Sequence, residues 1–172
     1  MNTILQQELK KILNGRFSQS ESTRLNYSRG EDTYDPILSK AVVFPETNEE
    51  VSKILKLCNE HKVPVVPFGT GTSLEGNVVG NDKGITISLE KMNKILTVNT
   101  QDFDCRVQAC VTREQLNDYL REDGVFFPID PGANAAIGGM ASTSASGTMA
   151  VKYGTMKTVI TGLTVVLSLI HI

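Results

Sequence analysis

Tryptophan is absent from this sequence of 172 residues, and only 6% of the residues are aromatic. The chain therefore offers no aromatic platform on which nucleic-acid bases could stack. Basic residues are not in excess either, since 17 Lys and Arg against 19 Asp and Glu give a net charge of -2. This balance gives no reason to expect nucleic acid or an anionic membrane surface as a partner.

Cysteines are few, and their spacing indicates no shared site. Cys58, Cys105 and Cys110 are an odd number, and no two have CxxC spacing, which argues against a zinc site or a disulfide framework. No apolar run approaches the roughly 20 residues of a membrane-spanning helix. Residues 1–13 lack the features of a signal or transit peptide. We therefore expect a cytoplasmic protein with reduced thiols, with peripheral membrane attachment of the full-length protein as the alternative.

What is present is an ordinary globular composition, with 40% hydrophobic and 21% charged residues. Apolar periodicity and two capping boxes predict an α+β fold with a mixed sheet. We expect helices at residues 3–13, after Thr47–Glu50 and after Thr112–Gln115, and strands at 41–44, 63–66, 84–89, 95–98, 105–109 and 158–167. The helix after Gln115 is expected to bury Leu116, Tyr119 and Leu120 and to end at Gly124, and residues 14–39 read as irregular.

Two glycine-rich, nearly uncharged segments stand out. The first glycine segment is residues 67–77, PFGTGTSLEGN, and the second glycine segment is residues 131–147, PGANAAIGGMASTSASG. Small residues let a ligand lie against the backbone, and hydroxyls with free N–H groups suit a phosphate. The pair predicts two contacts with one long, phosphorylated cofactor.

Spacing excludes two common nucleotide loops. Gly71 and Gly76 have the glycine spacing of a P-loop, but Asn77 and Val78 occupy the positions of its Lys and Ser/Thr. A Rossmann turn requires a third glycine where Leu74 stands. An NTPase and a Rossmann dinucleotide site are both disfavoured.

The two segments, in this order and about 60 residues apart, resemble the FAD-linked oxidases of the vanillyl-alcohol oxidase and p-cresol methylhydroxylase type. Within them the sequence is most similar to the D-lactate dehydrogenases and the glycolate oxidase flavin subunit. The stretches at 41–45, 127–132, 150–155 and 164–167 extend the similarity. The resemblance implies an FAD-binding PCMH-type domain made of two α/β subdomains that clamp FAD.

The resemblance also implies which residues bind the cofactor. The first glycine segment would hold the FAD pyrophosphate, through Pro67, Gly69, Thr70, Gly71, Thr72, Ser73, Gly76 and Asn77. The second would lie along the ribityl chain and flavin ring, through Pro131, Gly132, Gly138, Gly139, Ser142, Thr143, Ser144 and Gly147, with Tyr153 and Gly154 nearby. Some relatives tether FAD through His or Cys in the first segment, where this chain has Thr and Gly, so we expect non-covalent FAD.

The implied reaction is oxidation of a D-2-hydroxy acid, D-lactate or glycolate, to the 2-oxo acid. It requires a base for the hydroxyl proton and a cation for the carboxylate. His61 is expected to cap a helix, His171 lies near the C-terminus, and Asp130 is explained equally well by an Asp-Pro turn. We therefore assign no catalytic residue and no metal ligand. The resemblance implies that these groups lie in a C-terminal cap domain outside the 172 residues.

We expect residues 1–24 to form an N-terminal helix and linker, 25–167 a partial FAD-binding domain and 168–172 a non-native tail. The partial domain is expected to be inactive alone and to expose an unpaired sheet edge. Two alternatives stay open: an alkyl-dihydroxyacetone-phosphate synthase-like flavoenzyme and a non-catalytic, flavin-domain-like assembly subunit. The electron acceptor is open as well.

Overall fold

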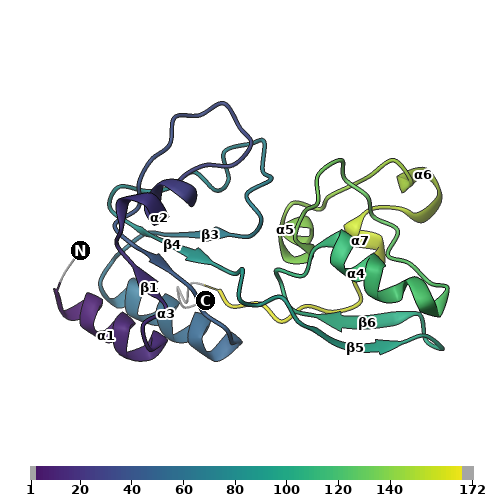
Figure 1. Cartoon of the computed structure of the whole chain (residues 1–172), viewed down its shortest axis with the longest axis horizontal. Helices are drawn as coiled ribbons and strands as arrows, with labels where there is room; N and C mark the ends of the chain where they lie inside the picture. The colour runs from purple at the N-terminus through teal and green to yellow at the C-terminus, as the bar shows by residue number, and fades with distance from the viewer. Residues whose placement is uncertain (1–2, 168–172) are drawn as a thin grey trace. The chain divides into compact units, whose positions relative to one another are not determined.

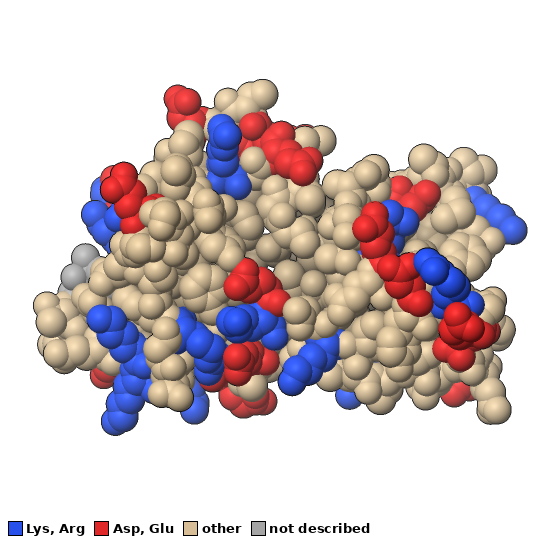
Figure 2. All heavy atoms as spheres, viewed as in Figure 1, with Lys and Arg blue, Asp and Glu red and all other residues tan. Residues whose placement is uncertain are grey.

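The computed structural model describes residues 3–167, which fall into two compact units (Figure 1). Within the described residues, unit 1 comprises residues 3–91 and 164–167, and unit 2 comprises Met92–Leu163. Each unit has its own sheet and its own core, as the implied pair of α/β subdomains requires. On the face seen in Figure 2, acidic and basic side chains are interspersed, in keeping with the nearly neutral net charge.

Unit 1 is built on a four-stranded sheet with the order β1-β2-β4-β3. Strand β1 pairs antiparallel with β2, whereas β4 pairs parallel with both β2 and β3, so the expected mixed sheet is confirmed. The elements are α1 (Thr3–Leu13), β1 (Phe17–Ser18), α2 (Glu21–Asn26), β2 (Val42–Val43), α3 (Asn48–Glu60), β3 (Val65–Phe68) and β4 (Ile85–Ser88). The expectation that residues 14–39 are irregular is wrong in part, because β1 and α2 lie there.

Helices α1 and α3 cover one face of this sheet. Leu5, Leu9 and Leu13 recur at helical spacing along α1 and are fully buried. They share one core with Ile54 of α3 and with Ile85 and other apolar side chains of the sheet. Thr47 begins α3, since its side chain accepts a hydrogen bond from the Glu50 N–H at 3.2 Å.

Strand β4 is an inner strand of the sheet and is buried along its whole length. Ile85 and Ile87 belong to the core under the helices. Thr86 and Ser88, which point to the other face, are also buried. That second face therefore has a cover of its own, and it contains polar partners: the Thr86 hydroxyl donates to the Ser39 hydroxyl at 2.8 Å.

Strands β2 and β3 are parallel to β4 but do not pair with each other, because β4 is inserted between them. Helix α3 makes the connection from β2 to β3. The return from β3 to β4 is made by residues 69–84, which contain no helix. A parallel connection must cross from one end of the sheet to the other, so the first glycine segment is the beginning of this crossover.

Unit 2 contains an antiparallel pair, β5 (Ile95–Asn99) and β6 (Asp104–Val107), followed by helical segments. These are α4 (Arg113–Leu120), the 3-10 turn η1 (Arg121–Asp123), α5 (Ile137–Ser142), α6 (Ala150–Tyr153) and α7 (Met156–Val159). Leu116 and Leu120 of α4 are buried as expected, but Tyr119 is 59% exposed, so its inward orientation was predicted wrongly. Gly124 ends η1 with a left-handed φ of 70°.

The strand expected at residues 158–167 does not form. Met156–Val159 is helix α7, and residues 160–167 have no regular structure. Thr155 begins the helix, and its N–H donates to the Thr158 hydroxyl at 3.4 Å. A local cap therefore overrides the β-branched pattern. The tail expected at 168–172 lies outside the described residues.

Candidate functional site

The first glycine segment leaves the sheet at the end of β3, where Pro67 and Phe68 are still paired with β4. Two of its glycines adopt left-handed backbone conformations, with φ of 75° at Gly71 and 70° at Gly76. This region is costly for a residue with a Cβ. The turn geometry therefore requires glycine at both positions, independently of any ligand.

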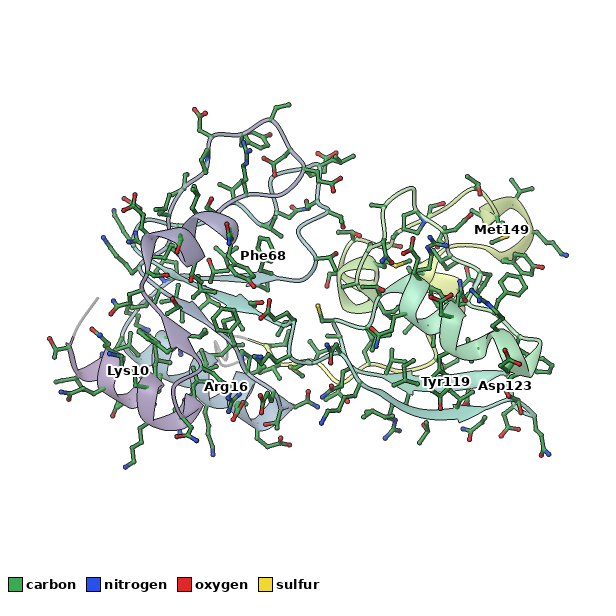
Figure 3. The ribbon with its side chains drawn as sticks, in the orientation of Figure 1. Lys10, Arg16, Phe68, Tyr119, Asp123 and Met149 are labelled. Carbon is green, nitrogen blue, oxygen red and sulfur yellow. The ribbon has the colours of Figure 1, made fainter. Side chains whose placement is uncertain are left out.

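An aromatic cluster packs at the end of β3, where the first glycine segment begins. The ring of Tyr27 packs edge-on against Phe68, with 5.0 Å between centroids, and against Phe44 at 5.5 Å. The Tyr27 hydroxyl donates to the Glu90 carboxylate. Figure 3 labels Phe68, which is 6% exposed. A Cβ on Gly71 would lie only 2.8 Å from Cζ of this ring, so the backbone lies directly against the far edge of the ring.

The tip of the first glycine segment carries backbone N–H groups that have no hydrogen-bond acceptor among the described residues. Among residues 3–167 we find no protein acceptor for the N–H groups of Gly69, Thr70, Gly71 and Thr72. The hydroxyls of Thr70 and Thr72 lie 3.4 Å apart. Successive backbone N–H groups in a turn, with hydroxyls beside them, can hold an anion without Lys or Arg. Ser73 and Asn77 follow in the same turn, with Ser73 half-buried and Asn77 exposed.

The second glycine segment was expected to be a loop throughout, and this is wrong in its middle. Residues Ile137–Ser142 form helix α5, whose Met140 is 2% exposed and anchors it in the core. Two backbone carbonyls just before α4 accept hydrogen bonds from the start of this helix. The N–H of Ile137 donates to Val111 O at 2.8 Å, and the N–H of Gly138 donates to Ala109 O at 2.8 Å. The first two N–H groups of α5 are therefore already paired.

The glycines of the second segment differ in what surrounds them. A Cβ on Gly138 would lie 2.8 Å from the Cβ of Ala109, and a Cβ on Gly147 would lie 2.3 Å from Asp130 Oδ1. Glycine is required there by packing within the protein. At Gly132 and Gly139 a Cβ would meet nothing within 4 Å. Protein packing gives no reason for glycine at these two positions, so they mark open space that a ligand can use.

Hydroxyl groups follow Gly139 on the same short helix. The Ser142 hydroxyl donates to Gly138 O at 2.8 Å, and the Thr143 hydroxyl donates to Gly139 O at 3.1 Å. Each hydroxyl oxygen keeps acceptor capacity. Ser144 has a φ of 51° and ends the helical path. Pro131, like Gly132, precedes the helix, and it is half-buried.

Asp130 anchors the end of the second segment. Its carboxylate accepts a hydrogen bond from the Thr148 hydroxyl at 2.7 Å and from the N–H of Met149 at 3.3 Å; Met149 is labelled in Figure 3. These bonds, the Thr148 one above all, lower the pKa of Asp130. A carboxylate held ionised in this way is a poor proton acceptor, so the geometry favours the turn interpretation over a catalytic base.

Tyr153 and Gly154 end helix α6. The Tyr153 ring packs edge-on against Phe126, with centroids 5.6 Å apart, and Lys152 Nζ lies 4.9 Å from its centroid. Gly154 has a φ of 81°, and a Cβ there would lie 2.5 Å from Thr158 Oγ1. Packing and a turn account for both residues.

Histidines do not contribute to either segment. His61 follows α3 as its C-cap, as expected, and its Nε2 is 3.8 Å from a Glu8 carboxylate oxygen. His171 lies outside the described residues. Across residues 3–167 no group of three His, Cys, Asp or Glu side chains could hold a metal ion.

Comparison with known proteins defines the class. The chain belongs to the FAD binding domain family, whose model matches residues 39–169. It is 46% identical over 151 residues to the probable mitochondrial D-lactate dehydrogenase of Danio rerio, covering 88% of this chain and 30% of that protein. It is 41% identical to the mitochondrial D-lactate dehydrogenase [cytochrome] of Arabidopsis thaliana, covering 93% of this chain and 29% of that protein. The glycolate oxidase subunit GlcD of Bacillus subtilis is 32% identical, with 88% and 33% covered.

Solved structures agree on the fold. Alkyldihydroxyacetonephosphate synthase superposes with a TM-score of 0.84 at 23% identity, covering 91% of this chain and 35% of that one. p-Cresol methylhydroxylase superposes with a TM-score of 0.61 at 24% identity, covering 73% and 25%. The expected PCMH-type fold is thus confirmed, and so is FAD as the cofactor. The chain spans about a third or less of the length of these relatives.

The residues present fit such a cofactor. The first glycine segment offers unpaired N–H groups at its tip, and the second has glycines that open onto empty space. One feature was missed in the sequence: residues 28–40, which lie against the first segment (Figure 1). The only signal for them was the run Ser28-Arg29-Gly30-Glu31-Asp32, which is rich in turn formers.

Proposed function

We propose that the full-length protein is an FAD-dependent oxidoreductase that oxidises a D-2-hydroxy acid, D-lactate or glycolate, to the 2-oxo acid. The observation that carries the proposal is the 46% identity, over 88% of this chain, to a protein named as a probable D-lactate dehydrogenase. When bound, FAD supplies the two-electron acceptor, with the flavin N5 taking the hydride. The 172 residues contribute cofactor binding to this activity.

The first glycine segment is proposed to bind the pyrophosphate. The N–H groups of Gly69, Thr70, Gly71 and Thr72 have no acceptor among the described residues, and two hydroxyls lie in the same tip. Pro67 sets the exit from β3, while Ser73, Gly76 and Asn77 continue the turn. Oriented dipoles bind a dianion without charged side chains when their positions are fixed in advance. The covalent link formed by His or Cys is not available at these positions, so the FAD is proposed to be non-covalent.

The second glycine segment is proposed to lie along the ribityl chain and the flavin ring. A Cβ at Gly132 or Gly139 would meet no protein atom within 4 Å, and the hydroxyl residues Ser142, Thr143 and Ser144 follow Gly139 in the chain. Pro131 begins the segment, Gly138 and Gly147 are required by packing within the protein, and Tyr153 and Gly154 follow in the sequence. In this proposal these residues leave room for the cofactor and contribute no charged side chain.

We assign no catalytic residue within the 172 residues. Asp130 is held ionised by its hydrogen bonds, and His61 caps a helix. The base for the substrate hydroxyl and the cation for its carboxylate are proposed to lie outside this chain, with the substrate. Residues 25–167 are proposed as part of the FAD-binding domain, with residues 1–24 as an N-terminal helix and linker.

The cellular location is a separate part of the proposal. None of the helices in residues 3–167 is long and apolar enough to cross a bilayer. The relatives from Danio rerio and Arabidopsis thaliana are named as mitochondrial, whereas the Bacillus subtilis relative is not. The cytoplasmic location stays a prediction, as does the absence of a nucleic-acid partner; fractionation of cells with antibody detection tests the first.

Two observations bear on the alternatives. The likeness to alkyldihydroxyacetonephosphate synthase is one of fold, at 23% identity. An assembly subunit would be expected to have degraded glycine segments, whereas the turn glycines Gly71 and Gly76 retain the conformations that glycine alone adopts cheaply.

Anaerobic reduction by substrate distinguishes these functions. Purified full-length protein should show a flavin band near 450 nm (a general property of oxidised flavins), which bleaches on addition of D-lactate or glycolate. A band that persists with both acids contradicts the hydroxyacid activity but leaves the flavoprotein assignment standing. Acid precipitation should leave the pellet colourless, and a yellow pellet would contradict non-covalent binding.

A further inference from the structure

Residues 28–40, here called the strap, follow α2 and return to the second face of the unit 1 sheet at Ser39, which accepts a hydrogen bond from the Thr86 hydroxyl. All but the last two residues of the strap precede the match to the FAD binding domain family, which begins at residue 39. In Figure 1 the strap follows α2 and runs beside the crossover from β3 to β4. Contacts link the two segments at several points between Ser73 and Gly84.

The contact closest to the tip of the first glycine segment is at Ser73. The Glu31 N–H donates to Ser73 O at 3.0 Å. Gly30 lies so near that a Cβ there would be 2.5 Å from the same oxygen. The Asp32 carboxylate fixes this turn, because its two oxygens accept from the N–H of Gly30 at 3.1 Å and of Tyr34 at 3.0 Å.

Further along, the strap holds the rest of the crossover. The Tyr34 ring lies against Gly76, where a Cβ would come within 2.7 Å of it. The Gly80 N–H donates to Ser28 O at 2.9 Å, and the Asn81 N–H donates to the Ser39 hydroxyl at 3.1 Å. Ser28 and Ser39 are almost completely buried.

The result is a division within one loop. Its tip, residues 69–72, makes no hydrogen bond to the strap within residues 3–167, whereas the residues after it contact the strap at Ser73, Gly76, Gly80, Asn81 and Gly84. A binding loop whose base is fixed before the ligand arrives loses less conformational freedom on binding. The turn around Asp32 therefore acts on the tip through Ser73, the first residue after it.

We propose that Gly30 and Asp32 are positioning residues for FAD: they fix Ser73 and thereby orient the unpaired N–H groups at the tip. The proposal rests on the proposed function, in which that tip binds the pyrophosphate. Neither residue touches the cofactor in this proposal. Its consequence is that FAD affinity depends on a segment outside the glycine motif.

The test compares two glycine-to-alanine variants of the full-length protein. Gly30→Ala forces Ser73 O to move, whereas Gly162→Ala adds a methyl group where nothing lies within 4 Å, and neither residue has a left-handed φ. FAD titration of the apo-proteins, followed by quenching of flavin fluorescence, should give a Kd about tenfold higher for Gly30→Ala, which corresponds to about 1.4 kcal/mol, and no change for Gly162→Ala. At saturating FAD the kcat of both should match the wild type.

A second variant keeps the test decisive if Gly30→Ala fails to fold. Asp32→Asn retains one oxygen acceptor but loses the other, so it should also raise the Kd for FAD, by a smaller factor. Wild-type Kd in either folded variant overturns the proposal, and so does a lower melting temperature of the apo-protein without a change in Kd, which indicates a purely structural role. If the wild-type protein itself binds no FAD, that result contradicts the proposed function, on which the positioning role rests.

Discussion

Two neighbouring glycines of helix α5 give a pair of substitutions with opposite expected effects. Replacing Gly138 by alanine places a methyl group 2.8 Å from the Cβ of Ala109 and 2.9 Å from its carbonyl oxygen. The same change at Gly139 meets no atom within 4 Å. The two variants have identical composition and lie on one helix, so each is the control for the other.

The expected stabilities follow from two competing effects. Alanine is favoured over glycine inside a helix by about 1 kcal/mol. Gly139→Ala should gain part of this, roughly 0.5 kcal/mol, because α5 is short and the site is near its start. Gly138→Ala adds an overpacking cost of about 1–3 kcal/mol, since the contact is with backbone as well as with a methyl group. The net result for Gly138→Ala is a less stable protein.

Cofactor affinity should change differently. In the proposed site the space beside Gly139 receives FAD, so the added methyl group occupies volume that the cofactor needs. The Kd for FAD should rise at least tenfold, or about 1.4 kcal/mol. Gly139→Ala is therefore expected to be at least as stable as the wild type without FAD and weaker in binding it.

Both quantities are measured on the full-length apo-protein, by urea unfolding and by FAD titration. Wild-type FAD affinity in Gly139→Ala would show that the open space is not part of the cofactor site. Equal stability of the two variants would instead refute the packing constraint at Gly138. Each outcome contradicts a different step of the reasoning.

Three further predictions concern stability and reactivity. Because hydrogen bonds lower the pKa of Asp130 from its usual 3.8, its stabilisation is present at neutral pH and lost as the pH falls through the lowered value; the gap in urea midpoint between wild type and Asp130→Asn should close below about pH 4. A gap that persists in strong acid contradicts this. Arg16 Nη2 lies 2.5 Å from the Glu50 carboxylate, so Arg16→Met should cost about 1–2 kcal/mol in urea unfolding, as for a charged hydrogen bond, and an unchanged midpoint would refute it. A thiol reagent should modify exposed Cys105 in the native protein and spare Cys58, whose pKa burial raises to about 11; peptide mapping checks this, and native labelling of Cys58 would contradict it.

Elements with a strong local signal could be predicted from the sequence. Both capping boxes begin helices, because the side chains of Thr47 and Thr112 accept the expected N–H bonds. The reciprocal half is decided by tertiary neighbours. The Glu50 carboxylate accepts from the nearby Glu46 N–H at 2.8 Å but also pairs with distant Arg16, and the Gln115 amide donates to Asn93 O at 2.9 Å. Local sequence determines where such a helix starts, but not where its polar side chains end up.

The mistaken elements share a cause. Helix α5 is rich in small residues and has no polar cap, and what pairs its first N–H groups is the distant backbone of Ala109 and Val111. Nothing in the sequence of residues 131–147 indicates that these distant carbonyls pair the N–H groups of the helix. The strap is irregular, as expected, but its contacts were missed for the same reason: its buried Ser28 and Ser39 find their partners across the fold, at Gly80 and Thr86.

Glycine itself has two roles in this chain, and composition does not separate them. Gly71 and Gly154 serve the backbone, because their left-handed φ values and close neighbours would exclude any larger residue. Gly132 and Gly139 have no such constraint. An unobstructed glycine indicates a ligand only together with the segment in which it lies, because Gly162 is equally unobstructed. The functional weight of the second segment therefore rests on these two open positions, while that of the first rests on the unpaired N–H groups at its tip.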